Sequence, residues 1–150
     1  VEVKQACVEM LNGVARAAPQ AEIEGLLVQR MVPGGRETIA GVSRDPTFGA
    51  LVMFGLGGVY VEALHDVVFR IAPLGPLEVH DMLKGIRGVA ILEGVRGAPP
   101  VDFAALADVV LRVARLALDL EEIAELDINP LLAFPTGATA VDARILLRSV

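Results

Sequence analysis

Cysteine and long apolar runs are both scarce in this sequence, and each shortage excludes a class of protein. Cys7 is the only cysteine among 150 residues, so an internal disulfide framework is excluded, which fits a reducing cytosol. No apolar run approaches the roughly 20 residues that a transmembrane helix requires. The N-terminal residues Val1–Lys4 also lack the pattern of a secretory signal. We therefore expect a cytoplasmic protein without a membrane span.

Positive charge is scarce as well. The chain has 13 Lys and Arg against 19 Asp and Glu, for a net charge of −6, and this balance argues against a nucleic-acid surface. A small-molecule or protein partner is expected instead. The hydrophobic content of 54% is enough to build a core, and the length fits one ordinary domain or a large piece of one.

The N-terminal segment has the pattern of an amphipathic helix. Apolar residues recur at helical spacing over residues 3–17, with polar residues between them. They are Val3, Cys7, Met10, Leu11 and Val14. Cys7 is therefore interpreted as a packing residue and not as a nucleophile.

The next part of the chain has the pattern of strands. Short β-branched and aliphatic runs are separated by glycine and proline turns that suit hairpins. The runs are Leu26–Val32, Glu37–Val42, Ala50–Phe54 and Val67–Ala72. A meandering antiparallel sheet is expected.

The second half predicts two helices and a closing hairpin. Residues 77–92 return to helical spacing, which two internal glycines weaken. Asp102 is a natural N-cap for a helix that runs to about Leu120. Residues Ala124–Phe134 and Thr139–Leu147 then form the hairpin. The expected fold class is α+β, a largely antiparallel sheet with helices packed on it.

The closing hairpin holds the clearest chemical signal. The two-residue period of a strand places Asp127 and Asn129 on the same face. If the hairpin folds symmetrically about Thr136 and Gly137, Asp142 falls opposite Leu131 and diagonal to Asn129. Diagonal neighbours lie roughly 7–8 Å apart, so the three side chains would converge.

Such a set of oxygen donors suits magnesium. This ion takes one or two ligands from protein and leaves the remaining positions to waters and substrate phosphates. The sequence therefore predicts a magnesium-nucleotide site at Asp127, Asn129 and Asp142. The alternative is a hairpin face on which these residues are simply solvated.

Glycines between the second and third predicted strands offer a weaker signal. Gly55–Gly58 lacks the lysine of a P-loop and the spacing of a dinucleotide fingerprint. It is either a tight turn or a place where backbone amides approach a phosphate, with Glu62 near the rim. Glu37 is either a solvated strand residue or an acceptor for ribose hydroxyls. His65 and His80 have no second ligand at zinc spacing and are assigned no catalysis.

Several motifs in order resemble the ADP-forming acyl-CoA synthetases, which are acetyl-CoA synthetases of the ATP-grasp superfamily similar to the β subunit of succinyl-CoA synthetase. The resemblance runs from about Glu24 to Ile145. Its motifs are Glu24–Val32, Gly35–Glu37, Asp45–Gly49, Phe54–Val59 and Glu125–Leu131.

The resemblance implies a role for each matching segment. Val28, Gln29, Arg30 and Met31 would form the linker strand that contacts adenine, with Gln29 at the base-facing position, and Glu37 would lie near the ribose or phosphates.

Further matches concern the metal and the phosphoryl group. Asn129 and Asp142 match the magnesium ligands, with Asp127 as a supporting acid. Gly57 and Gly58 of the glycine turn would border the place where a phosphohistidine segment enters. The acid Glu62, a catalytic candidate, would lie there too.

The resemblance also implies an architecture and a reaction. Residues 1–150 would be the C-terminal part of an ATP-grasp domain, with a leading helix and loop over 1–24 and a nucleotide- and metal-binding subdomain over 25–150. Such enzymes bind ATP or ADP with Mg²⁺. They pass phosphate from ATP to a histidine and then to the acid as an acyl phosphate, which CoA finally displaces.

The chain departs from the family in what it lacks. The phosphate-holding lysine of an ATP-grasp site has no counterpart, since the only lysines are Lys4 and Lys84. No matching phosphohistidine motif or CoA-binding domain is present either. We therefore expect a CoA-binding ligase domain or α subunit as partner, an oligomeric full enzyme, and no activity from the chain alone. The alternatives are a degenerate ATP-grasp module that senses ligands in a larger protein, such as an acetyltransferase fusion, and a purely structural interaction domain.

Overall fold

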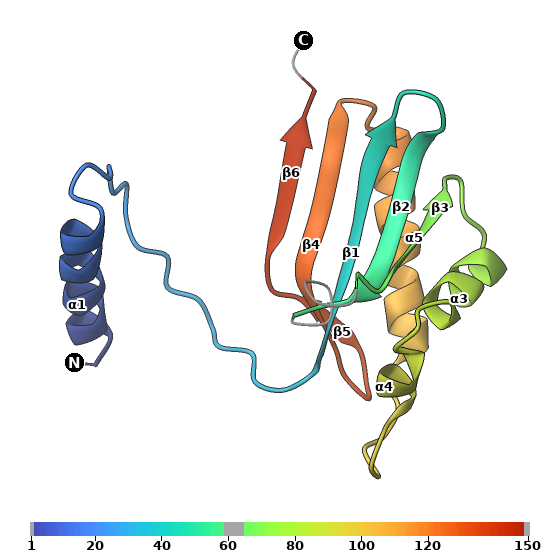
Figure 1. Ribbon diagram of the computed structural model, residues 1–150, viewed down its shortest axis with the longest axis horizontal. Coiled ribbons are helices and arrows are strands. Elements are labelled where there is room, and N and C mark those ends of the chain that lie inside the picture. The colour runs from blue at the N-terminus through green and yellow to red at the C-terminus, as the bar shows by residue number, and fades with distance from the viewer. Residues whose placement is uncertain (1, 59–64, 149–150) are drawn as a thin grey trace. The chain divides into compact units, whose positions relative to one another are not determined.

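The computed structural model describes residues 2–58 and 65–148, and the chain divides into two compact units, Val1–Val32 and Pro33–Val150. The first unit contains helix α1 (Glu2–Ala17), which is amphipathic as predicted but has no buried residue (Figure 1). The strand expected at Leu26–Val32 is wrong, because this segment has no regular structure. Residues 2–32 contain no strand, so the backbone of Leu26–Val32 has no partner with which to form a β-ladder.

The second unit is built on a six-stranded antiparallel sheet (Figure 1). The strand order is β3-β2-β1-β4-β5, and β6 also pairs with β4. The strands are β1 (Arg36–Asp45), β2 (Gly49–Leu56), β3 (Val67–Ile71), β4 (Ile123–Ala133), β5 (Ala138–Ala140) and β6 (Ala143–Leu147). The antiparallel meander and the closing hairpin expected from the sequence are therefore confirmed.

Among the described residues, three helices cover one side of this sheet. They are α3 (Pro76–Lys84), α4 (Val89–Glu93) and α5 (Phe103–Asp119). Alternate strand residues point toward them and form the core with the apolar helix faces. Fully buried members of this core include Val52, Phe54, Leu83, Leu106 and Val110. The helices leave the opposite side of the sheet, here called the open face, facing the viewer in Figure 1.

Helix α5 begins and ends as its sequence predicts. The Asp102 side chain accepts the backbone N–H of Ala105 at 3.0 Å and that of Gly137 at 2.9 Å, so it caps the helix and holds the hairpin turn. At the other end, the Arg44 guanidinium donates to the carbonyls of Ile123 at 2.7 Å, Leu120 at 3.0 Å and Ala117. Carbonyls that the last helical turn leaves unpaired thereby gain a charged donor.

The single helix expected over residues 77–92 is interrupted. Helix α3 ends at Lys84, and α4 begins only at Val89. Between them, the backbone N–H groups of Arg87 and Gly88 donate to the Asp66 carboxylate, both at 2.7 Å. In a continuous helix these two N–H groups would donate to carbonyls four residues earlier. Their bonds to Asp66 therefore favour a break at this glycine-containing segment.

The register of the closing hairpin differs from the prediction. Leu131 pairs with Ala140, and the Asn129 N–H donates to the Asp142 carbonyl at 3.1 Å. Asp142 therefore lies beside Asn129 and not opposite Leu131. The turn is centred one residue earlier than expected, on Pro135 and Thr136, since the Phe134 N–H donates to the Gly137 carbonyl at 3.1 Å. Among the described residues, no helix has the length and apolar character needed to cross a membrane.

Candidate nucleotide and metal site

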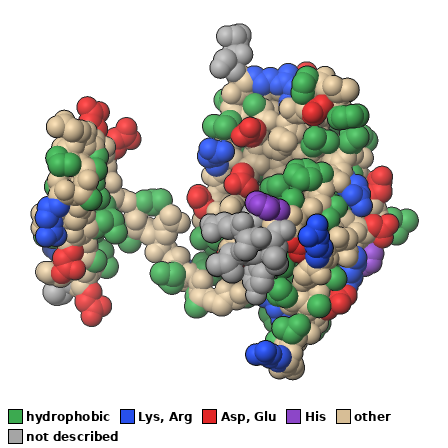
Figure 2. Space-filling view, in the orientation of Figure 1, with side chains coloured by type: hydrophobic (Ala, Val, Ile, Leu, Met, Phe, Trp, Pro, Cys, Tyr) green, Lys and Arg blue, Asp and Glu red, His purple; other side chains and the backbone are tan. Residues whose placement is uncertain are grey.

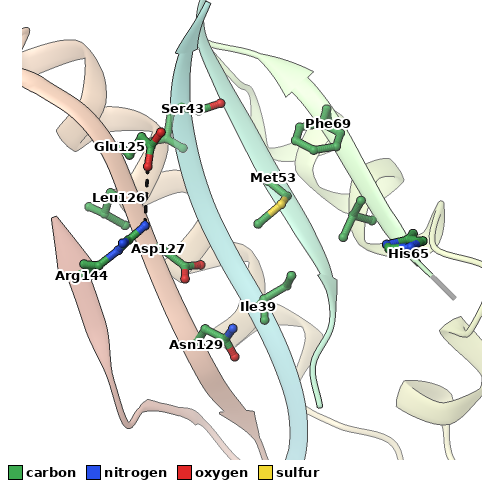
Figure 3. A pocket seen from close by; sticks show the side chains of 12 residues that line it. Ile39, Ser43, Met53, His65, Phe69, Glu125, Leu126, Asp127, Asn129 and Arg144 are labelled. Carbon is green, nitrogen blue, oxygen red and sulfur yellow. Dashed lines mark ion pairs between the residues drawn. The ribbon is translucent and has the colours of Figure 1, made fainter. Parts of the chain in front are cut away.

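A cavity of about 420 Å³ lies on the open face of the sheet (Figure 3). Residues paired across neighbouring strands share a face, and one such row runs across the sheet. Arg144 pairs with Asp127, Asp127 with Gly41, Gly41 with Met53, and Met53 with Phe69. Figure 2 shows hydrophobic, acidic and basic side chains together on this face. The cavity is lined by Ile39, Val42, Ser43, Met53, His65, Val67, Phe69, Glu125, Leu126, Asp127, Asn129 and Arg144.

Two strand glycines, Gly41 and Gly55, are each paired across the sheet with residues that line the cavity. A Cβ on Gly41 would lie 2.6 Å from the Leu126 carbonyl oxygen, and one on Gly55 would lie 2.5 Å from the Asp66 carbonyl oxygen. Neither position accommodates a side chain without movement of the backbone. Glycine inside a strand weakens it and often marks a close approach by a ligand or another backbone.

Polar residues of β4 and β6 occupy one side of the cavity. Glu125 and Arg144 form an ion pair at 3.6 Å, and both side chains are more than half exposed. Arg144 thereby offsets the charge of Glu125. Asp127 is half-buried and Asn129 exposed, and among the salt bridges between described residues none involves Asp127 or Asp142. This side therefore presents oxygen donors with net negative charge.

Asp142 lies in the short break between β5 and β6. Besides the backbone bond from Asn129, its Oδ1 accepts the N–H of Ala143 at 2.9 Å. The structure thus brings the Asp142 and Asn129 backbones together, with Asp127 two residues along β4. Over residues 2–58 and 65–148 there is no group of three or more His, Cys, Asp or Glu residues able to hold a metal. A site in this hairpin would use few protein ligands.

Glu37, Gly57 and Gly58 belong to a second cavity. Its volume is about 460 Å³, and it is lined by Gly35, Arg36, Glu37, Leu56, Gly57, Gly58 and Ile91. The Gly57 N–H donates to the Glu37 carbonyl at 2.7 Å. Gly58 has a positive φ of 58°, and a Cβ there would collide with the Glu37 carboxylate. The structure therefore brings together three residues that the sequence singled out separately.

The remaining predicted residues are Val28–Met31 and Glu62. Val28, Gln29, Arg30 and Met31 belong to the first unit, where the side chains of Val28 and Met31 are 68% and 84% exposed. Glu62 lies outside the described residues.

The lysine of the second unit is engaged in another contact. Lys84 forms an ion pair with Glu93 at 2.5 Å and lies 4.0 Å from the centre of the Phe103 ring.

Sequence reasoning missed several residues of the open-face cavity. Beside the lining residues, Gly41 interrupts an apolar strand, and that interruption was a usable signal of close approach. Met53 and Phe69 occur in ordinary strand patterns, so only the pairing of strands reveals that they share a face. His65 offers no local signal, because its position beside the cavity depends on how β3 pairs with β2.

Comparisons with known proteins identify the family to which the chain belongs. The family model described as "ATP-grasp domain" matches residues 1–147. The chain is 49% identical over 97% of its length to acetate–CoA ligase [ADP-forming] I of Archaeoglobus fulgidus, of which it covers 21%. It is 46% identical over 97% of its length to acetate–CoA ligase [ADP-forming] I subunit beta of Pyrococcus furiosus, of which it covers 63%.

A solved structure is also similar. It is the acetyl-coenzyme A synthetase 1 of Ca. Korarchaeum cryptofilum in complex with coenzyme A, Ca-AMPCP and HgCl⁺. The TM-score is 0.92 at 50% identity, and the match covers 98% of this chain and 64% of that one. The chain thus spans less than two thirds of the length of these proteins.

Proposed function

The chain belongs to the ATP-grasp domain family, and we propose that it is the nucleotide- and magnesium-binding part of an ADP-forming acyl-CoA ligase. The observation that carries this proposal is the polar side of the open face. Asp127 and Asn129 line the cavity there, and the Asn129 backbone is bonded to that of Asp142. The names of the relatives, acetate–CoA ligases that form ADP, support the reaction class.

The donor set suits magnesium. Asn129 and Asp142 would hold the ion through an amide and a carboxylate oxygen, and Asp127 would act as a supporting acid. A site with so few protein ligands leaves room for waters and for phosphate oxygens. When bound, the ion would offset the negative charge of the phosphates and of the transferred phosphoryl group.

We propose nucleotide contacts for the other residues that the sequence singled out. We propose that Glu37 accepts hydrogen bonds from ribose hydroxyls or lies beside the phosphates. Gly57 and Gly58 would let backbone approach the ligand or the incoming phosphohistidine segment. Residues Val28–Met31 would contact adenine. Glu62 would border the entrance of the phosphohistidine segment as the catalytic candidate.

The complete reaction requires more than this chain. We propose that the complete enzyme converts acid, ATP and CoA to acyl-CoA, ADP and phosphate through phosphohistidine and acyl phosphate. The clamping lysine, the phosphohistidine and the CoA-binding domain would come from other sequence or from an α subunit. The beta-subunit name of the Pyrococcus furiosus relative supports such a partner, and we propose an oligomeric, cytoplasmic enzyme.

Calorimetric titration with ADP, with and without magnesium, tests the proposal in the complete assembly. Loss of a hydrogen bond to a charged group costs about 1.5–3 kcal/mol, so Asp142→Ala should weaken magnesium-dependent ADP binding by about 10- to 100-fold. Asp108→Ala is the control, because Asp108 lies exposed on α5 and pairs only with Arg112 at 2.7 Å. Equal affinity in wild type and Asp142→Ala contradicts the metal assignment. Absence of magnesium-dependent binding in the wild type favours the ligand-sensing or structural alternatives.

A further inference from the structure

His65 lies on the wall of the open-face cavity, immediately before β3. In Figure 3 it lies at the β3 end of the cavity, whereas Asp127 and Asn129 lie on β4. Its φ of 46° is in the left-handed region. A non-glycine residue pays roughly 1–2 kcal/mol for this conformation. Such strain is most often kept where a side chain has a task.

Asp66 fixes the backbone directly after His65. Its side chain is only 3% exposed, and its carboxylate accepts the N–H groups of Arg87 and Gly88, both at 2.7 Å. Its carbonyl also accepts the Leu56 N–H at 3.3 Å. A buried carboxylate is stable only when it is hydrogen-bonded in this way. The three bonds therefore tie the start of β3 to the end of β2 and to the turn after α3.

The width of the cavity indicates an extended ligand. From β4 through β1 and β2 to β3 there are three strand spacings, or roughly 14 Å. A metal ion alone is far smaller than this span. The β4 side offers the oxygen donors that a metal requires. His65 offers an imidazole N–H, which suits an anionic oxygen.

We propose that His65 is a further ligand-binding residue that donates a hydrogen bond to a phosphoryl oxygen of the bound nucleotide, and that Asp66 is the positioning residue that holds His65 there. This inference rests on the proposed function, because it requires magnesium-nucleotide binding to the open face. It adds a contact on the opposite side of the cavity from the metal ligands. It also explains why a strained backbone is kept at an exposed position.

Two substitutions at position 65 separate strain from binding. Both His65→Ala and His65→Gly remove the imidazole and should weaken nucleotide binding by about tenfold, equivalent to about 1.4 kcal/mol. Glycine accepts the positive φ without penalty, so the melting temperature of His65→Gly should exceed that of His65→Ala by a few degrees. His80→Ala, at an exposed position on α3, should leave affinity unchanged.

The affinities are measured calorimetrically in the complete assembly with two probes, magnesium-ADP and the magnesium complex of β,γ-methylene ATP. A loss with both probes places the contact at the phosphates they share, and a loss with the methylene analogue alone places it at the terminal phosphate. Unchanged affinity for both probes in His65→Ala overturns the proposal. Failure of the wild type to bind either probe refutes the proposed function instead.

A double-mutant cycle tests the role of Asp66. If Asp66 acts through His65, Asp66→Asn weakens nucleotide binding in the wild type but not in His65→Ala, while it lowers the melting temperature in both backgrounds. A further loss of affinity in the double variant overturns the positioning role. Should Asp66→Asn not fold, Asp66→Glu, which keeps the charge but displaces the carboxylate, takes its place with the same expected pattern.

Discussion

Two phenylalanines on neighbouring strands should differ sharply in their contribution to stability. Phe54 of β2 points toward the helices and is 0% exposed, whereas Phe69 of β3 lies on the open face and is 48% exposed. Truncation of a buried phenylalanine to alanine costs about 3–5 kcal/mol. Complete burial of such a side chain is worth about 1.5–3 kcal/mol, so the half-exposed Phe69 should contribute about 1 kcal/mol. Phe54→Ala should therefore destabilise the protein by about 2–4 kcal/mol more than Phe69→Ala.

Urea denaturation followed by circular dichroism measures this difference. Native domains are stable by only about 5–15 kcal/mol, so Phe54→Ala should shift the midpoint strongly while the slope with urea stays unchanged. Phe69→Ala is the matched control, because the two residues lie in adjacent paired positions, Phe54 with Val68 and Met53 with Phe69. Equal losses of unfolding free energy would refute the assignment of a covered face and an open face.

Three other substitutions test single contacts. Hydrogen bonds from the N–H groups of Gly137, first, and Ala105 lower the pKa of Asp102. The ionised carboxylate therefore stabilises the fold fully at pH values above its unfolded pKa of about 3.9. This stabilisation is lost as the pH falls through the lower pKa of the folded state. Urea midpoints between pH 7 and 3 should accordingly depend less on pH in Asp102→Asn. Arg44→Met removes the donor to the carbonyls at the end of α5. It should lower the free energy of unfolding by about 1–3 kcal/mol, measured by the same urea denaturation at pH 7. Gly41→Ala should lower the melting temperature, since overpacking costs about 1–3 kcal/mol; an unchanged value would contradict the close approach of the Leu126 carbonyl.

Local signals predicted much of the second unit. The cap at Asp102 and the apolar spacing after it predicted α5 to within a residue or two, and turn glycines and prolines marked the strands. These elements are set by interactions among near neighbours in the chain. Pattern and propensity therefore agree with the final fold.

Signals that depend on distant partners were misread. Leu26–Val32 has the composition of a strand, but its unit provides no strand to pair with it. The helix over residues 77–92 breaks because Asp66, some twenty residues earlier, takes two backbone N–H groups from the turn. The sequence alone does not show either contact.

Only part of the candidate site was predicted, because some of its residues are placed by local patterns and others by distant contacts. Asp127 and Asn129 share a face through strand alternation, which is local. The position of Asp142 depends on the geometry of one turn. A small error in that turn led to a predicted position diagonal to Asn129, whereas Asp142 lies beside Asn129 in the structure. His65 joins the cavity, and Gly41 lies beside its lining residues, only through pairing across the sheet. The pattern along one strand does not reveal either position.

The open face has a consequence for altering this protein. Substitutions at Met53 or Phe69 change the lining of the cavity without removing side chains from the helix-covered core. A variant library restricted to such positions can therefore be screened for new ligands while most members still fold. Tolerance should end abruptly at Gly41 and Gly55, where the two glycines leave no room for a side chain.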